Sequence, residues 1–258
     1  MPSHGEKYYF VSSLAKGLRM LELLAANGDM SAARMARCLD TGRAVSHRFL
    51  TTLRDLGYVE KTEEGRFRLT FKILELGMQK LDEFEIRRIA QPFMQEMAQA
   101  FGETVNLGHW DGKTIVHLSK INSTEILRLD LGLGALAPAY CTGLGKAVLA
   151  FLPERELEDY LQAVRWVAIS PKTITTPEGL MADIKKIRQR GYAIDNEELS
   201  LGLRCVAAPV FDHTGRPTFA LSVSSPTQRM PQKKIQAIQA KLVPLCRRLS
   251  RLIGAPDR

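Results

Sequence analysis

The chain has 258 residues, 45% of them hydrophobic, which describes an ordinary globular protein of one large or two modest domains. Its 36 Lys and Arg against 28 Asp and Glu give a formal net charge of +8. That excess is compatible with nucleic acid, an acidic surface or a small anion as partner, and it does not choose among them. The four cysteines lie far apart with no Cys-x-x-Cys pair, which argues against a zinc finger or a disulfide framework.

No export signal or membrane span is expected from the sequence. The N-terminal stretch "MPSHGEKYYF" lacks the basic and apolar regions of a signal peptide. The most apolar stretch, residues 135–153, contains Pro138 and Lys146, so it is better explained as a loop followed by a helix than as a membrane span. We therefore expect a cytoplasmic protein with reduced thiols.

The first 40 residues predict two helices. Ser13 is placed to begin a helix that runs to Asn27, and Gly28 is placed to close it in a left-handed conformation. Ser31 is placed to cap a second, short helix that ends near Leu39. The sequence "DTG" at 40–42 then predicts a tight turn.

A third helix and a short hairpin follow this turn. The helix has an apolar stripe that we expect to face inward, formed by Val45, Phe49, Leu53 and Leu56. Gly57 is expected to end it. Two β-like runs, Tyr58–Lys61 and Arg66–Leu69, come next. Helix, helix, turn, helix and hairpin in this order predict a winged helix-turn-helix.

The polar side of the third helix is predicted to bind DNA. Arg43 and His47 are placed to reach base edges from a slim N-terminal turn, and other side chains are placed to hold the phosphate backbone. The full predicted DNA-binding set is Arg43, Ser46, His47, Arg48, Thr51, Arg54, Lys61 and Arg66. The alternative is an ordinary surface helix whose charges are only solvated, which the helix-turn-helix context makes less favourable.

A polar helical connector is predicted from Thr70 to about Arg88, with the junction of the two halves within Met78–Glu83. Pro92 fits the first turn of a new helix, Gln91–Phe101, better than a helix interior. From Glu103 the pattern becomes α+β. The strands expected are Thr104–Gly108, Thr114–Ser119, Ile126–Leu131, Val206–Phe211 and Thr218–Ser224, and the helices expected are Gly143–Phe151, Glu154–Gln162, Pro177–Gln189 and Gln232–Ile253.

Several residues of the second half suggest a binding site only weakly by themselves. Gly143 and Gly145 bracket a helix start, where backbone amides can approach an anion or where glycine merely permits close packing. Ser222 and Ser224 lie on one face of a strand. Tyr140 and Ala147 break a phosphate-loop motif, and Pro138 follows a "GLGALA" sequence where a nucleotide-binding fold needs a helix.

The two halves together resemble the IclR family of bacterial transcriptional regulators. The first half is similar over "SLAKGLRMLELLAANGDMSAARMARCLDTGRAVSHRFLTTLRDLGYVEK…GRFRLTFKILELG", and the second over "ETVNLGHWDGKTIVHLSKI", "YCTGLGKAVLAFLP" and "GYAIDNEELSLGLRCVAAPVFDHTGRPTFALSVSSP". Family members commonly carry Lys-Ser-Thr-Val before the His-Arg pair. This chain has Arg43, Ala44, Val45 and Ser46 there, so its operator cannot be taken from better-known members.

The resemblance implies an α+β protein in three parts. These are a winged helix-turn-helix at 11–77, a helical linker at 78–101 and a GAF-like α/β effector-binding domain at 102–255. It implies double-stranded operator DNA and a small organic-acid effector as partners, in a homodimer or a dimer of dimers, with a KdgR-like, sugar-acid-responsive branch as the nearest pattern. The effector site implied is Gly143, Leu144, Asp195, Cys205, Ser222 and Ser224. Asp195 would accept a hydrogen bond from a ligand hydroxyl.

Three other functions are compatible with parts of the sequence. A thiol-dependent enzyme or a redox sensor can use Cys141 or Cys205, but no histidine is placed by a motif to act as the base. His109 and His117 are interpreted as packing or surface residues, and neither a metal site nor a cofactor is expected. An adaptor that uses the winged helix for protein contacts is disfavoured by the basic third helix.

Overall fold

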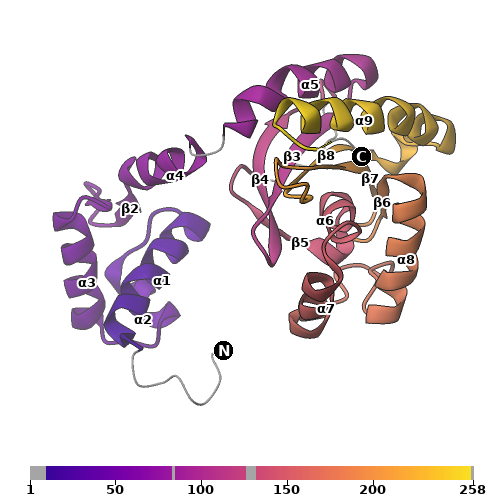
Figure 1. The fold of residues 1–258 in the computed structure, drawn as a ribbon. Coiled ribbons are helices and arrows are strands. Elements are labelled where there is room, and N and C mark those ends of the chain that lie inside the picture. The colour runs from indigo at the N-terminus through magenta and orange to yellow at the C-terminus, as the bar shows by residue number, and fades with distance from the viewer. Residues whose placement is uncertain (1–9, 83–84, 126–131, 257–258) are drawn as a thin grey trace. The chain divides into compact units, whose positions relative to one another are not determined.

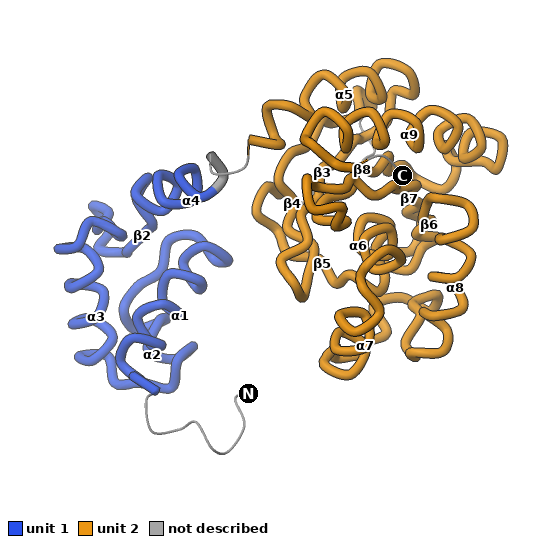
Figure 2. Tube along the Cα trace, viewed as in Figure 1, with its two compact units in different colours: residues 1–83 blue, residues 84–258 orange. Residues whose placement is uncertain are grey.

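The structure, a computed structural model, describes residues 10–82, 85–125 and 132–256 and forms two compact units, 1–83 and 84–258 (Figures 1 and 2). The elements of the first unit are α1 (Ser12–Asn27), α2 (Ala32–Cys38), α3 (Arg43–Asp55), β1 (Val59–Lys61), β2 (Phe67–Leu69) and α4 (Lys72–Asp82). The second unit contains α5 (Ile86–Phe101), β3 (Thr104–Trp110), β4 (Thr114–Ile121), β5 (Leu136–Pro138), η2 (Ala139–Cys141), α6 (Gly143–Leu149), α7 (Glu154–Ala163), α8 (Pro177–Arg190), β6 (Ala193–Asn196), β7 (Leu203–Val210), β8 (Phe219–Pro226), η3 (Thr227–Arg229) and α9 (Gln232–Leu252).

The first unit is the winged helix-turn-helix that the sequence predicts. Ser31 caps α2 by accepting a hydrogen bond from the Arg34 amide at 3.2 Å, as predicted. The helix α1 starts one residue before Ser13, at Ser12, and has no side-chain cap. β1 and β2 pair as an antiparallel hairpin, and Met30 adds an isolated bridge to Phe67 that the sequence analysis did not predict.

A small apolar core holds this unit together. Met20 and Leu24 of α1, Met35 of α2, Leu50 of α3 and Phe67 of β2 are fully or almost fully buried in it. Burial of side chains of this size contributes about 1.5–3 kcal/mol each. The helix α3 is therefore fixed in orientation by contacts from two helices and the hairpin.

The second unit is built on one six-stranded antiparallel sheet in the order β5-β4-β3-β8-β7-β6. The helices α5 and α9 cover one face of the sheet, and α6 packs on the other with α7 and α8 beyond it (Figure 1). Side chains alternate between the two faces along each strand, so Leu221 and Val223 of β8 point away from Ser222. These two apolar side chains are fully buried.

The capping predictions for α8 are confirmed, and the prediction for Pro92 is wrong. Thr176 accepts a hydrogen bond from the Gly179 amide at 3.1 Å, and Gly191 closes α8 with φ of 79°. The helix α5 begins at Ile86, so Pro92 lies inside it. A buried stripe of Ile86, Ala90, Met94 and Met97 runs through the proline and fixes the whole helix against the sheet.

The junction of the units falls after residue 83, at the end of the range expected for it. The helix α5, expected to form part of a separate linker at 78–101, belongs to the second unit. The expected strand Ile126–Leu131 lies outside the described residues. No helix in the described part of the chain combines the length and apolarity that a membrane span requires.

Candidate functional site

The helix α3 is rotated relative to the stripe predicted from sequence. Ser46 and Leu50 are fully buried, and Phe49 and Leu53 are partly buried beside them. Val45 and Leu56, which were expected to face inward, are 36% and 54% exposed. The prediction for these two residues is wrong because the inward stripe follows positions 46, 49, 50 and 53, which also has helical spacing.

Ser46 is the one member of the predicted DNA-binding set that the structure buries. Its side chain is 0% exposed, and its hydroxyl lies 2.7 Å from the Thr41 hydroxyl. Buried hydroxyls require such a partner. Ser46 therefore joins the turn to α3 and is not placed to contact DNA, which corrects the prediction for this residue.

The other predicted residues of α3 lie on one outward side. Arg43, His47, Arg48 and Arg54 are exposed, and Thr51 is half-buried. The His47 ring packs edge-on against Phe67 at 6.0 Å between ring centres, which holds it against the hairpin. Arg54 donates hydrogen bonds of 3.1 and 2.9 Å to Asp55. An exposed ion pair of this kind contributes little to stability. Another anion, such as a DNA phosphate, can therefore replace Asp55 as the partner of Arg54.

The hairpin presents charges of both signs. Lys61 and Arg66, which were predicted to hold phosphates, are exposed, but Glu63 and Glu64 lie between them at the turn. Across the strands, Arg68 donates to Glu60 at 2.6 Å. Because the acidic side chains offset the basic ones, the hairpin attracts a polyanion less strongly than α3 does.

All six predicted effector-site residues line one cavity in the second unit. It lies between the sheet and the start of α6, and its lining includes Gly143, Leu144, Asp195, Cys205, Ser222 and Ser224. Register explains the convergence: Asp195 of β6 is opposite Cys205 of β7, which is opposite Ser224 of β8. Directly opposed residues point to the same face of a sheet. The cavity measures about 30 Å³, room for a water molecule or two but not for an organic acid.

The two glycines at the start of α6 have different reasons to be glycine. A Cβ on Gly145 would lie 2.3 Å from the backbone of Ala139, so only glycine fits there. Gly143 faces the cavity, and a Cβ there would approach Cys205 at 3.3 Å. Thr142 caps the helix by accepting from the Gly145 amide at 3.1 Å. Gly145 is therefore structural, whereas Gly143 keeps the cavity wall thin.

Asp195 is a fully buried carboxyl group with one unused oxygen. Its Oδ1 accepts hydrogen bonds from the amides of Glu198 at 2.7 Å and Leu199 at 3.4 Å. Its Oδ2 is buried without a hydrogen-bond partner. Burial raises the pKa of Asp195 to about 7, and the neighbouring Glu198 raises it as well. A buried polar atom without a partner is costly, so Oδ2 favours a ligand that supplies one.

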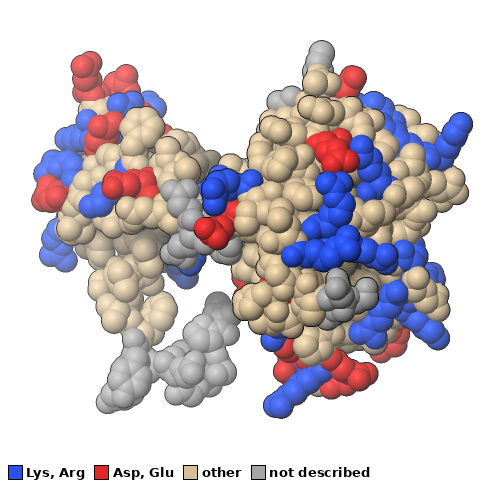
Figure 3. Space-filling view, turned by 45° about the horizontal axis from the view of Figure 1, so that its top comes forward, with Lys and Arg blue, Asp and Glu red and all other residues tan. Residues whose placement is uncertain are grey.

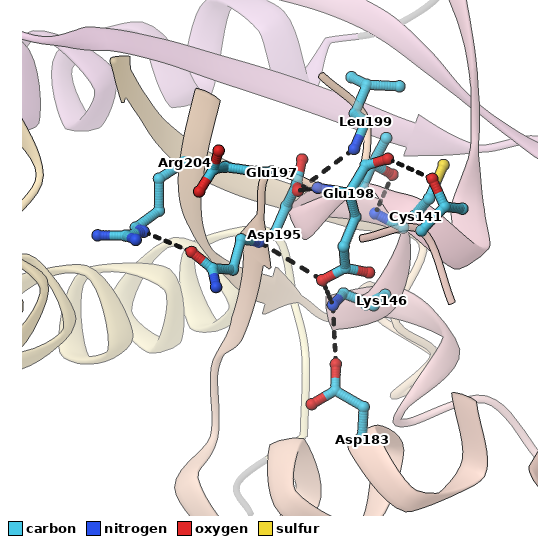
Figure 4. A network of polar contacts seen from close by, with 12 residues as sticks. Cys141, Lys146, Asp183, Asp195, Glu197, Glu198, Leu199 and Arg204 are labelled. Atoms are coloured by element: carbon cyan, nitrogen blue, oxygen red, sulfur yellow. Dashed lines mark hydrogen bonds and ion pairs between the residues drawn. The ribbon is translucent and has the colours of Figure 1, made fainter. Parts of the chain in front are cut away.

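A buried ion network connects this wall of the cavity to α6 and α8 (Figure 4). Lys146 of α6 is 0% exposed and donates to Glu198 at 2.5 Å and to Asp183 of α8 at 2.8 Å. Glu198 is the residue whose amide binds Asp195, as Figure 4 shows. Hydrogen bonds therefore connect Asp195, through Glu198, to Lys146 of α6 and Asp183 of α8.

Five further residues line the cavity, and two of them, Asn106 and His117, bring polar groups from other strands. Asn106 of β3 donates to Ser224 at 3.1 Å and to Ser222 at 3.4 Å, which orients both hydroxyls. His117 of β4, expected to be a packing or surface residue, is 4% exposed and lines the cavity with an unpartnered Nδ1. Burial lowers the pKa of His117 to about 4, so its ring is neutral. The pairing of β3 with β8 and of β4 with β3 places them there.

The two cysteines of the alternative function are not activated. Burial raises the pKa of Cys141 to about 12, with Asp195 and Glu198 adding to the effect. The pKa of Cys205 is raised for the same reasons. A nucleophilic thiol needs a lowered pKa and a base. Among the described residues, no three His, Cys, Asp or Glu side chains are grouped as metal ligands.

Two family models match the chain in the order of its two units. The model of the IclR helix-turn-helix domain matches residues 13–63, and the model described as bacterial transcriptional regulator IclR C-terminal matches residues 78–251. The second match alone spans more than half of the chain. The two matched regions together contain the α3 residues, Lys61 and the cavity residues described above, and Arg66 lies between them.

The chain is similar to transcriptional regulators over almost its whole length and theirs. The HTH-type transcriptional regulator KdgR of Escherichia coli is 34% identical over 248 residues, covering 96% of this chain and 94% of KdgR. The HTH-type transcriptional regulator XynR of the same organism is 30% identical, covering 95% and 98%. The crystal structure of the Thermotoga maritima IclR has a TM-score of 0.81 at 33% identity, covering 94% and 99%.

Proposed function

Because the chain belongs to the IclR family of bacterial transcriptional regulators, and is therefore a ligand-responsive DNA-binding regulator, we propose that a small organic acid in the cavity controls its binding to operator DNA. The acid is a hydroxy, keto or sugar acid, and the controlled genes are catabolic. The regulator acts in the cytoplasm, where such operators lie. The similar proteins are regulators, so the thiol-enzyme alternative is not favoured.

The exposed side of α3 is the proposed contact with DNA. Arg43 and His47 reach base edges in the major groove, while Arg48, Thr51 and Arg54 hold phosphates. Lys61 and Arg66 of the hairpin add weaker phosphate contacts. The exposure of these α3 side chains supports this assignment. Val45 joins the outward side and is suited to touch a thymine methyl group.

Two copies of α3 are needed for a specific operator. One short recognition helix makes few base contacts, so regulators of this kind pair to read two half-sites about 34–36 Å apart. We propose a homodimer or a dimer of dimers for this reason. The operator would then be a palindrome or a near-palindrome.

The ligand's chemistry follows from the lining of the cavity. The carboxylate of the acid would be held by the amides of Gly143 and Leu144 and by the hydroxyls of Ser222 and Ser224. A hydroxyl of the ligand would donate to Oδ2 of Asp195. That unpartnered, fully buried oxygen is the single observation that carries the proposal.

Binding must change the shape of the second unit. A cavity of about 30 Å³ cannot admit an organic acid, so Asp195 or the neighbouring leucines, Leu199 and Leu203, must move. Movement of Asp195 would pull on Glu198 and, through it, on Lys146. A coupling of about 1–3 kcal/mol is enough to change operator occupancy between 5-fold and 150-fold.

A thermal-shift panel of hydroxy, keto, sugar and aromatic acids tests this proposal. We expect at least one acid of the first three groups to raise the melting temperature of the full-length protein. The same acid should have no effect on the Asp195→Asn and Ser224→Ala variants. Ser200→Ala, an exchange outside the cavity lining, is the matched control and should respond like the parent. Stabilisation that survives in all variants would overturn the assignment of the cavity.

A further inference from the structure

A second, larger cavity lies elsewhere in the C-terminal unit. It is formed by the C-terminal ends of α8 and α9, by β7 and by Phe151, which follows the C-cap of α6. Its volume is about 630 Å³, within the range of about 300–1,000 Å³ that small-molecule sites occupy. It shares no lining residue with the effector cavity described above.

Five arginines line this cavity, and none of its described lining residues is acidic. They are Arg188 and Arg190 of α8 and Arg247, Arg248 and Arg251 of α9. Figure 3 shows Lys and Arg side chains gathered on one face of the C-terminal unit. Five like charges around one hollow repel one another, and an anion bound between them would offset part of that repulsion.

Carboxylates elsewhere neutralise this cluster only in part. Arg248 is 3.7 Å from Glu96, and Arg190 is 3.9 Å from Asp183, both long for ion pairs. Arg188 donates to a backbone carbonyl, that of Ala150, at 2.5 Å, which fixes the side chain without cancelling its charge.

Arg247 and Arg251 are the two most available cations of the cluster. They are exposed, lie one helical turn apart on α9, and have no carboxylate partner among the residues that the structure describes. Residues four apart project from the same side of a helix. Two guanidinium groups therefore project from the same side of α9 into the lining of the cavity.

Another part of the lining is apolar. Phe151 and Phe211 meet edge to face with 5.7 Å between ring centres, and Ala208, Pro209 and Val243 continue the surface. A ligand that fills the cavity therefore needs an anionic end and an apolar or ring-bearing body. Guanidinium groups match phosphate oxygens in geometry and make two parallel hydrogen bonds to them.

We propose that this arginine-lined cavity is a second ligand site of the protein, and that it binds an organic phosphate with a ring-bearing body, such as a nucleoside phosphate. The phosphates lie against Arg247 and Arg251, and the ring lies against the Phe151–Phe211 pair. This site is separate from the proposed acid site, so either can exist without the other.

Isothermal titration of the full-length protein with ADP, in the absence of DNA, tests the proposal. We expect one ADP per chain, with binding weakened by added salt. The double variant Arg247→Gln/Arg251→Gln should bind ADP at least tenfold more weakly. Lys185→Gln/Lys233→Gln removes the same charge from exposed positions outside the cavity and should stay within twofold of the parent.

Further ligands and variants separate this site from the others. Pyrophosphate should bind more weakly than ADP, and adenosine should not bind measurably, because the site needs both charge and ring. ADP binding should persist in Asp195→Asn and in Arg43→Ala/Arg54→Ala. No binding of ADP, equal loss in both double variants, or loss in Arg43→Ala/Arg54→Ala would overturn the proposal.

Discussion

The two units use polar side chains in opposite ways. On α3 the basic side chains proposed to bind DNA are exposed, and Arg54 is paired with Asp55, which is also exposed. Around the effector cavity the polar groups are buried, and Lys146, Asp195 and Glu198 depend on one another. An exposed charge can be removed at little cost to folding, whereas removal of a buried one leaves its partner unpaired. Changes in α3 should therefore alter binding, and changes in the network should alter stability.

The largest expected effect is that of Lys146→Ala. It leaves Glu198 and Asp183 without their buried cation, and such losses typically cost about 3–5 kcal/mol. Urea denaturation followed by circular dichroism measures the change in the free energy of unfolding. Lys185→Ala, on the exposed side of α8, should change it by less than about 0.5 kcal/mol. If the two substitutions lowered the free energy of unfolding equally, the proposed contrast between buried and exposed charges would be wrong.

Substitution on α3 should affect DNA and leave the fold intact. Arg43→Ala should weaken operator binding by about 1–3 kcal/mol and relax base preference, if Arg43 reads a base. Arg54→Ala should weaken binding evenly across sequences and lower the salt dependence by about one phosphate contact. Fluorescence anisotropy with operator DNA and unrelated DNA at two salt concentrations distinguishes the base-specific loss from the uniform one.

An exposed lysine of α1, Lys16, provides the control for these variants. Lys16→Ala removes one positive charge from the same unit without touching α3. Its operator affinity should stay close to that of the parent, and the melting temperatures of all three variants should agree. If Arg43→Ala and Arg54→Ala bound DNA like Lys16→Ala, the assigned face of α3 would be wrong.

The pH dependence of stability tests the burial of Asp195. Its pKa is raised in the folded state to about 7 from 3.8, so folding holds a proton that the unfolded chain releases. The stability that this proton provides is fully present below pH 3.8 and is lost as the pH rises to about 7. Asp195→Asn should therefore lose less stability than the parent between pH 4 and 7. Parallel stability profiles would show that Asp195 is ionised or solvated throughout.

Ser46→Ala should have the smallest effect of the series and tests the corrected orientation of α3. It removes the buried hydrogen bond to Thr41, which should lower the free energy of unfolding by about 1 kcal/mol. Operator affinity, measured well below the melting temperature, should not change. A loss of affinity as large as that of Arg43→Ala would return Ser46 to the DNA-contacting set.

The sequence predicted the helix-turn-helix well but misjudged which side of α3 is buried. Its stripe was chosen by hydrophobicity, and Val45 and Leu56 are hydrophobic residues that stay exposed. Ser46 is buried instead because Thr41, five residues earlier, supplies its hydrogen bond. A hydrophobic pattern cannot predict the burial of a polar residue whose hydrogen bond is supplied by a neighbour in the chain.

In the second unit, local rules succeeded at helix ends and failed where distant segments meet. Thr176 and Gly191 were predicted correctly because capping depends on neighbouring residues. Pro92 was misplaced because packing against the sheet outweighs the local preference of proline. His117 was not assigned to the cavity, since its place there depends on the pairing of β4 with β3.

The central claim is that an acid bound near Asp195 changes the affinity of α3 for operator DNA. Anisotropy titration of operator DNA with and without the most stabilising acid tests it directly. We predict a change in affinity between 5-fold and 150-fold for the parent and none for Asp195→Asn. An unchanged affinity in the parent, or an equal change in the variant, would contradict it.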